Sequence, residues 1–158
     1  MLRPFLLRFD DLVARVEAVL IGLLVLAMTG VTLAQVVARY GFGDPLIWSE
    51  EAARYLFVWV TMIGAALAMQ QGGHYALDAL GRHLPAPMRS VVRFAALLVT
   101  AGFLALLLGT GIVEARQAGM QFSATLPMEM DLPYLAIPVG AALMLLHLAV
   151  SLLRPSAP

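Results

Sequence analysis

Four long stretches without Asp, Glu, Lys or Arg constrain this chain more than any other feature. They run from Ala18 to Ala38, from Tyr55 to Leu77, from Phe94 to Val113 and from Leu132 to Leu153. Each matches the ~20 residues that a helix needs to cross a bilayer core. Backbone N–H and C=O groups in the hydrocarbon core must form hydrogen bonds within their own segment, so such runs predict helices. We predict an all-α integral membrane protein, a single four-span domain over residues 1–158, with its transmembrane helices bundled at approximately 18–38, 52–72, 92–113 and 133–153.

The composition supports this class. Hydrophobic residues make up 61% of the 158 residues and charged residues 13%, whereas soluble domains carry about 25% charged residues. The chain has no cysteine, which excludes disulfides and thiolate metal sites. Its zero formal net charge gives no indication of nucleic-acid binding. The first run is longer than the ~7–15 residue apolar core of a secretory signal peptide, so we expect it to be a span.

The first 17 residues mix charges with regularly spaced apolar side chains. The apolar residues recur at intervals of three and four: Leu2, Phe5, Leu6, Phe9, Leu12, Val13 and Val16. This is the helical period, and it predicts an amphipathic helix at the membrane interface that runs into the first span. The alternative is a frayed polar tail.

The segments between the runs carry turn residues. A tight turn after the first span is predicted by Gly41, Gly43, Asp44 and Pro45. Ser49 is a candidate N-cap for the helix that follows. In the second loop, residues 75–80 could form a short interfacial helix. Pro138 lies within the fourth run and predicts a kink there.

The distribution of arginine predicts the orientation. One side of the membrane receives seven arginines: Arg3, Arg8, Arg15, Arg82, Arg89, Arg93 and Arg154. The other side receives three: Arg39, Arg54 and Arg116. Because cytoplasmic loops are enriched in basic residues, we expect the N- and C-termini to be cytoplasmic.

Few polar residues lie deep in the runs. They are a few threonines, Gln35 and one histidine, His147. Ionisable residues at that depth cost ~2.5–3.5 kcal/mol on insertion scales and are retained for function. We interpret His147 as a neutral side chain bonded to a neighbouring helix or lying near the interface, because a haem or metal site needs a second partner. We therefore predict no catalytic, metal or cofactor-binding residue, no cofactor and no enzymatic activity.

Small residues recur at four-residue spacing on every span. The sets are Gly30, Ala34 and Ala38; Gly64 and Ala68; Ala101, Ala105 and Gly109; and Ala136 and Gly140. Such spacing lets helices approach closely in lipid. It favours a packed assembly of helices that also has neighbours.

The start of the second span carries a charged and aromatic cluster. Glu50 and Arg54 are four residues apart, so they share a helix face and can pair. Trp48, Tyr55 and Trp59 lie along one face of the same helix. The residues alone leave two interpretations open: a solvated helix start, or a polar network that faces a partner.

This region resembles a known family signature. The residues that carry the resemblance are Pro45-Leu46-Ile47-Trp48-Ser49-Glu50-Glu51, Arg54-Tyr55, Gly64-Ala65-Ala66 and Gly73-His74 with Asp78. The pattern and its place after the first span are similar to those of the small, DctQ-like membrane subunit of TRAP transporters. The resemblance implies a partner interface made by Trp48, Glu50, Glu51, Arg54, Tyr55, Trp59, Gly64 and His74.

The resemblance also implies a function. In this family a small four-span scaffold subunit supports a larger, many-span permease subunit that carries the substrate and sodium sites and moves. Together they perform secondary active, sodium-coupled uptake of an organic acid that a periplasmic binding protein delivers. The expected location is the bacterial cytoplasmic (inner) membrane, with membrane lipid as a further partner and no nucleic acid.

Three other functions are alternatives to a transporter subunit: a small exporter, a membrane redox module and a membrane assembly factor. An autonomous four-span exporter needs a membrane-embedded acid, whereas Glu17 and Glu114 lie only at span ends. A membrane redox module needs paired histidines or cysteines. A membrane assembly factor stays open as an alternative.

Overall fold

The computed structural model describes residues 2–72 and 85–153. Its elements are α1 (Leu2–Val37), a π-helical turn η1 (Ala38–Phe42), α2 (Ser49–Gly72), α4 (Ala86–Ala118), the short α5 (Asp131–Tyr134) and α6 (Ala136–Ser151). Within these described ranges, four helical segments are long and apolar enough to cross a membrane. The predicted all-α membrane fold is confirmed. His74 and the helix expected at residues 75–80 lie outside the described residues.

Helix α1 is continuous from Leu2 into the first apolar run, so the N-terminal segment is helical and not a frayed tail. Its 36 residues span about 54 Å at about 1.5 Å per residue. A bilayer core is only about 30 Å thick. A substantial part of α1 must therefore extend beyond the hydrocarbon, as its charged first 17 residues require.

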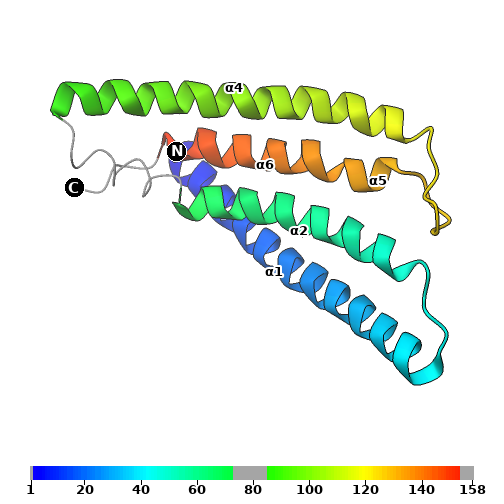
Figure 1. Ribbon diagram of the computed structural model, residues 1–158. Coiled ribbons are helices and arrows are strands. Elements are labelled where there is room, and N and C mark those ends of the chain that lie inside the picture. Colours follow the sequence, from blue (N-terminus) through cyan, green and yellow to red (C-terminus); the bar gives the residue numbers. More distant parts are fainter. Residues whose placement is uncertain (1, 73–84, 154–158) are drawn as a thin grey trace.

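Helices α4, α6 and α2 lie side by side in one open layer, and α1 runs at an angle to it, so the helices do not form a closed bundle (Figure 1). Helix α2 packs between α1 and α6, and α6 packs between α2 and α4. Helix α4 makes its extended contacts with α5 and α6. Helix α1 diverges from the layer toward η1, whereas its N-terminal end lies close to the end of α6 (Figure 1).

Helix α6 lies at the centre of the layer, where a glycine of α6 on one side and a glycine of α4 on the other allow close approach. A Cβ added at Gly140 would lie 2.8 Å from Met62 Cβ on α2. A Cβ added at Gly111 of α4 would lie 3.0 Å from the Ile137 side chain and from the Pro138 ring. The predicted small-residue contact is thus used within the chain at Gly140.

The predicted effect of Pro138 appears as a break in the helix. Helix α5 ends at Tyr134 and α6 begins at Ala136, with Leu135 between them. Pro138 has no N–H to bond the Tyr134 carbonyl, and its ring crowds that carbonyl. The helix is therefore interrupted one turn before the proline.

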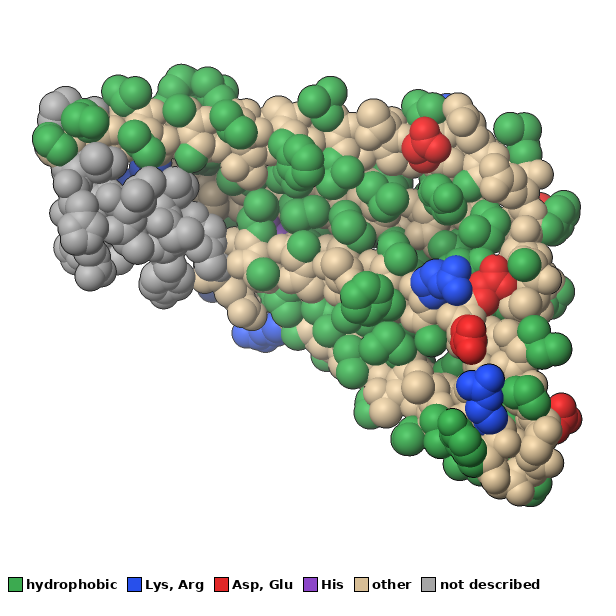
Figure 2. All heavy atoms as spheres, viewed as in Figure 1, with side chains coloured by type: hydrophobic (Ala, Val, Ile, Leu, Met, Phe, Trp, Pro, Cys, Tyr) green, Lys and Arg blue, Asp and Glu red, His purple; other side chains and the backbone are tan. Residues whose placement is uncertain are grey.

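Most of the apolar surface is uncovered. In the most apolar window of each segment, 39% of residues are buried for α5–α6 but only 6% for α1 and for α4. Hydrophobic side chains cover the middle of the face seen in Figure 2, and charged side chains lie toward its two ends. This pattern fits a molecule whose flanks contact lipid or another membrane protein.

Candidate functional site

The turn between α1 and α2 is fixed by polar side chains. Gly43 adopts φ 71°, a left-handed conformation that favours glycine. Leu46 N donates a hydrogen bond to Gln35 Oε1 at 2.7 Å. The glutamine of the first span therefore stabilises the turn. The buried Ser49 donates its Oγ–H to the Leu46 carbonyl at 2.7 Å. Ser49 thus closes the turn rather than bonding a backbone N–H of α2.

Glu51 joins the start of α2 to the loop that follows α4. Its carboxylate accepts hydrogen bonds from Thr125 N at 2.9 Å, from Ala124 N at 3.3 Å and from the Thr125 hydroxyl. Tyr55 donates its hydroxyl to the same carboxylate and lies 2.9 Å from Met130 Sδ. One carboxylate therefore holds a loop more than 70 residues away in sequence.

The loop itself folds back like a hairpin. Ser123 N donates to the Met128 carbonyl and Met130 N to the Gln121 carbonyl, both at 2.9 Å. Leu126 N donates to Ser123 Oγ at 3.1 Å. These bonds leave the N–H groups of Ala124 and Thr125 near the tip, where Glu51 accepts them.

Five other residues of the predicted partner interface are described, and each of them is exposed or half-buried. Glu50 and Arg54 are both exposed, and no ion pair joins them in the part of the chain that the structure describes. Trp48 is 40% exposed, and Trp59 and Gly64 are half-buried. Within the cluster, Glu51 and Tyr55 therefore form hydrogen bonds inside the chain. Trp48, Glu50 and Arg54 stay at the surface.

A second polar cluster is buried between α1 and α6. His147 Nδ1 lies 2.7 Å from Asp10 Oδ1, and Nε2 lies 3.0 and 3.2 Å from the two oxygens of Glu17. The predicted bond from His147 to a neighbouring helix is confirmed, but the sequence analysis did not foresee its partners. A signal existed: Asp10 and Glu17 are seven residues apart and flank the buried Ala14, so all three occupy one helix face.

This cluster does not have the form of a metal site. The two carboxylates bond opposite nitrogens of the imidazole ring, so they point toward the ring from two sides and do not converge on a common point. Among the described residues, no group of three or more His, Cys, Asp or Glu side chains is arranged to hold a metal ion.

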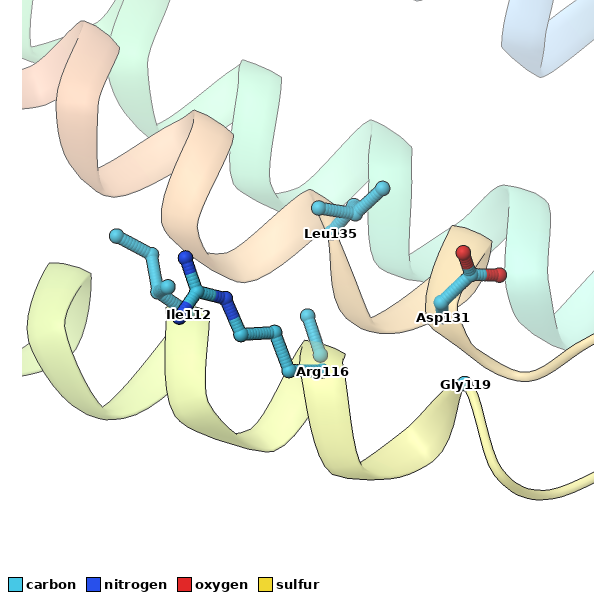
Figure 3. A pocket seen from close by; sticks show the side chains of 6 residues that line it. Ile112, Arg116, Gly119, Asp131 and Leu135 are labelled. Carbon is cyan, nitrogen blue, oxygen red and sulfur yellow. The ribbon is translucent and has the colours of Figure 1, made fainter.

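A groove of about 350 Å³ lies between α4 and α5–α6, lined by Ile112, Ala115, Arg116, Gly119, Asp131 and Leu135. In Figure 3 the Arg116 side chain runs back along α4 toward Ile112, while the Asp131 carboxylate points away from it. The two charges do not converge, so the groove lacks the geometry of an ion-binding cage.

Comparison with known proteins identifies relatives. A family model described as "Tripartite ATP-independent periplasmic transporters, DctQ component" matches residues 28–157. The sialic acid TRAP transporter permease protein SiaT of Haemophilus influenzae is 32% identical over 131 residues, which is 83% of this chain and 21% of that protein. The C4-dicarboxylate TRAP transporter small permease protein DctQ of Rhodobacter capsulatus is 36% identical over 104 residues, covering 65% of this chain and 46% of that protein.

The relatives differ in the substrate that their names give. The ectoine TRAP transporter small permease protein TeaB of Halomonas elongata is 33% identical over 76 residues, 48% of this chain and 39% of that protein. The matched region thus spans less than half the length of each of these curated relatives.

Proposed function

Since this chain belongs to the family of DctQ components of tripartite ATP-independent periplasmic transporters, we propose that it supports a larger, many-span permease subunit. Members of the family are transporter subunits and not enzymes, and the chain is a multi-pass membrane protein. The family match over residues 28–157 is the observation that carries the proposal.

In the proposed assembly the larger subunit holds the substrate and sodium sites and moves, while this chain stays in place. Sodium coordination in a bilayer takes several converging oxygens, commonly at an unwound helix. In the described spans, the buried His147 forms hydrogen bonds with Asp10 and Glu17 instead. The half-buried Gln35 accepts a hydrogen bond from Leu46 N in the turn. Because these polar groups are used within the chain, they favour a scaffold role for this subunit over a role in binding the transported ion.

The open layer also supports a partner in the membrane. A Cβ added at Gly30, Gly64 or Gly109 would have no atom of a neighbouring helix within 4 Å. The glycines of these three rows therefore do not pack closely against another helix of this chain, in contrast to Gly140. A second membrane protein could approach closely along those rows.

We propose a partner interface on α2 with Trp48, Glu50, Arg54, Trp59 and Gly64 as contact residues. His74, which the sequence resemblance adds to this interface, lies outside the described residues. Glu51 and Tyr55 belong to this interface indirectly, because they hold the loop at residues 119–130 beside it. Exposed Arg and Trp side chains are the types that most often anchor protein interfaces.

The proposed location is the bacterial inner membrane, with both termini in the cytoplasm. The seven-to-three division of arginines supports this orientation. The turn after η1 and the loop at 119–130 then face the periplasm, where a substrate-binding protein would deliver an organic acid. The relatives' names cover sialic acid, C4-dicarboxylate and ectoine, so we assign the choice of substrate to the other subunits.

Co-purification tests the proposal. The tagged chain is co-expressed with a candidate many-span TRAP permease subunit, extracted in a mild detergent and purified by its tag. We expect the permease in stoichiometric yield. Recovery of this chain alone, with the permease present in the membrane fraction, would count against the proposal. An unrelated four-span protein with the same tag is the control for non-specific capture.

A further inference from the structure

We propose that the groove between α4 and α5–α6 seats the headgroup of one phosphatidylethanolamine molecule, with its phosphate on Arg116 and its ammonium on Asp131. The site is independent of the proposed transport function, because residues of α4 and α5–α6 line it and residues of α2 do not. The volume of about 350 Å³ falls in the ~300–1,000 Å³ range of small-molecule sites. The groove is therefore large enough for a headgroup.

The lining of the groove is apolar toward the membrane. A Cβ added at Gly119 would lie 3.6 Å from Asp131 Cβ, so the absence of a side chain there keeps the groove open. Ile112 and Leu135 line it and are 39% and 38% exposed. Val139, one turn farther along α6, is 38% exposed. Apolar side chains thus continue from the groove along the span, where an acyl chain can contact them.

Arg116 is the one basic residue among the described residues that line the groove. A helical side chain leans toward the N-terminus of its helix, and Arg116 accordingly runs back along α4 toward Ile112 (Figure 3). The charge-free run of α4 ends at Val113, so the guanidinium points toward the hydrocarbon. Arginines near the ends of spans usually extend toward water instead. This guanidinium needs an anion at the edge of the hydrocarbon core, where the headgroup region of the lipids begins.

Asp131 provides a negative charge in the same groove. Its carboxylate points away from Arg116 (Figure 3). Within residues 2–72 and 85–153, no ion pair or hydrogen bond joins either side chain to another residue. Two opposite charges in one groove that do not pair with each other fit a ligand that carries both charges on separate atoms. Phosphatidylethanolamine has this form, with a short carbon linker between its phosphate and its ammonium.

Neighbouring charges do not compete for the phosphate. Glu114 precedes Arg116 by two residues, and side chains at that spacing do not face each other on a helix. From Ile112 to Leu135 the sequence has no basic residue other than Arg116. The guanidinium is therefore the group to which an anion in this groove binds, and it can donate two parallel N–H bonds to a phosphate.

The two charges also select among headgroups. The ammonium of ethanolamine has N–H groups that donate to a carboxylate, whereas the trimethylated ammonium of phosphatidylcholine has none. Phosphatidylglycerol has the phosphate without a cation, so Asp131 would repel it. We therefore expect phosphatidylethanolamine to bind more tightly than either of these lipids.

Native mass spectrometry of the full chain tests this selectivity. The chain is purified in detergent, stripped of co-purified lipid and mixed with phosphatidylethanolamine, phosphatidylcholine or phosphatidylglycerol of identical acyl chains. We expect one phosphatidylethanolamine per chain, bound about tenfold more tightly than the other lipids, as one charge-assisted hydrogen bond provides. Equal binding of phosphatidylcholine, or tighter binding of phosphatidylglycerol, would overturn the proposal.

Variants assign the binding to the two side chains. Arg116→Gln should weaken the binding of all three lipids about tenfold. Asp131→Asn should weaken the binding of phosphatidylethanolamine most and should not weaken that of phosphatidylglycerol. The matched controls are Arg39→Gln and Glu114→Gln, exposed charges that do not line the groove. They should leave the binding of all three lipids unchanged, and the same loss in a control would contradict the proposed site.

A phosphatidylethanolamine with a photoreactive acyl chain locates the bound molecule. Crosslinks should map to Ile112, Leu135 and Val139, and excess unlabelled phosphatidylethanolamine should remove them. Crosslinks elsewhere only, or loss of these crosslinks when a second membrane protein covers the groove, would overturn the proposal. Should the Arg116 or Asp131 variant fail to fold, the lipid comparison and the crosslinks on the unaltered chain still decide the question.

Discussion

At the scale of single residues, Glu51 ties the start of α2 to the loop at residues 119–130. It accepts from two backbone N–H groups and two hydroxyls, on Ala124, Thr125 and Tyr55. Its neighbour Glu50 is exposed and bonds none of them. Two adjacent glutamates of the same chemistry thus have different roles, because only one faces the loop.

We expect Glu51→Gln to loosen the loop at residues 119–130. The amide keeps the side chain's size but loses its charge and replaces an acceptor oxygen with a donor NH₂ that cannot accept these N–H bonds. Limited proteolysis of the purified protein should cleave the loop several-fold faster than in the wild type. Glu50→Gln is the matched control and should leave the rate unchanged. Equal rates for both variants would show that Glu51 does not anchor the loop.

The sequence predicted some residue roles and missed others for a physical reason. Contacts at four-residue spacing within one helix can be predicted from sequence, and this spacing is the basis of the predicted pair between Glu50 and Arg54. The bonds that form instead join Glu51 to Thr125 and His147 to Asp10, across separate helices. Sequence spacing does not encode which faces of distant helices meet.

At the scale of elements, the packing of α6 against α2 depends on the absence of a side chain at Gly140. A Cβ there would lie 2.8 Å from Met62 Cβ and 3.1 Å from the Met62 carbonyl oxygen, so the helices would have to separate. Gly30 of α1 has nothing within 4 Å of its added Cβ.

We expect Gly140→Ala to destabilise the isolated chain by about 1–3 kcal/mol, the usual cost of overpacking. Gly30→Ala should be neutral, or stabilising by up to about 1 kcal/mol, because alanine favours a helix more than glycine does. Thermal unfolding in detergent checks both variants. A destabilisation of the same size at the two positions would mean that α2 and α6 do not approach as closely as described.

The elements themselves were largely predictable. The first charge-free run lies in α1 and η1, and the third lies in α4. The second run begins in α2 and the fourth in α5, and each extends a few residues past the end of its helix, α2 or α6. Pro138 marked the break before α6. The order of helices in the layer was not predictable, because apolar faces in lipid carry no strong inside–outside pattern. The small residues indicated close contacts but not which of them lie within the chain.

At the scale of the whole molecule, the open arrangement of helices leaves much apolar surface uncovered. Only 6% of the residues in the most apolar windows of α1 and α4 are buried. The polar side chains Gln35 and His147 form hydrogen bonds within the chain. We therefore propose that this chain is a static support for a moving transporter subunit that carries the ion and substrate sites.

The sodium dependence of uptake by the reconstituted complex tests that claim most directly. Gln35→Leu and Thr61→Val remove polar groups from the first and second spans, where Gln35 bonds Leu46 N and Thr61 bonds the Phe57 carbonyl. We expect the half-saturating sodium concentration to equal that of the wild type, even where Gln35→Leu lowers the yield of complex. A shift in that concentration for a fully assembled variant would place part of the transport site in this chain and contradict the account.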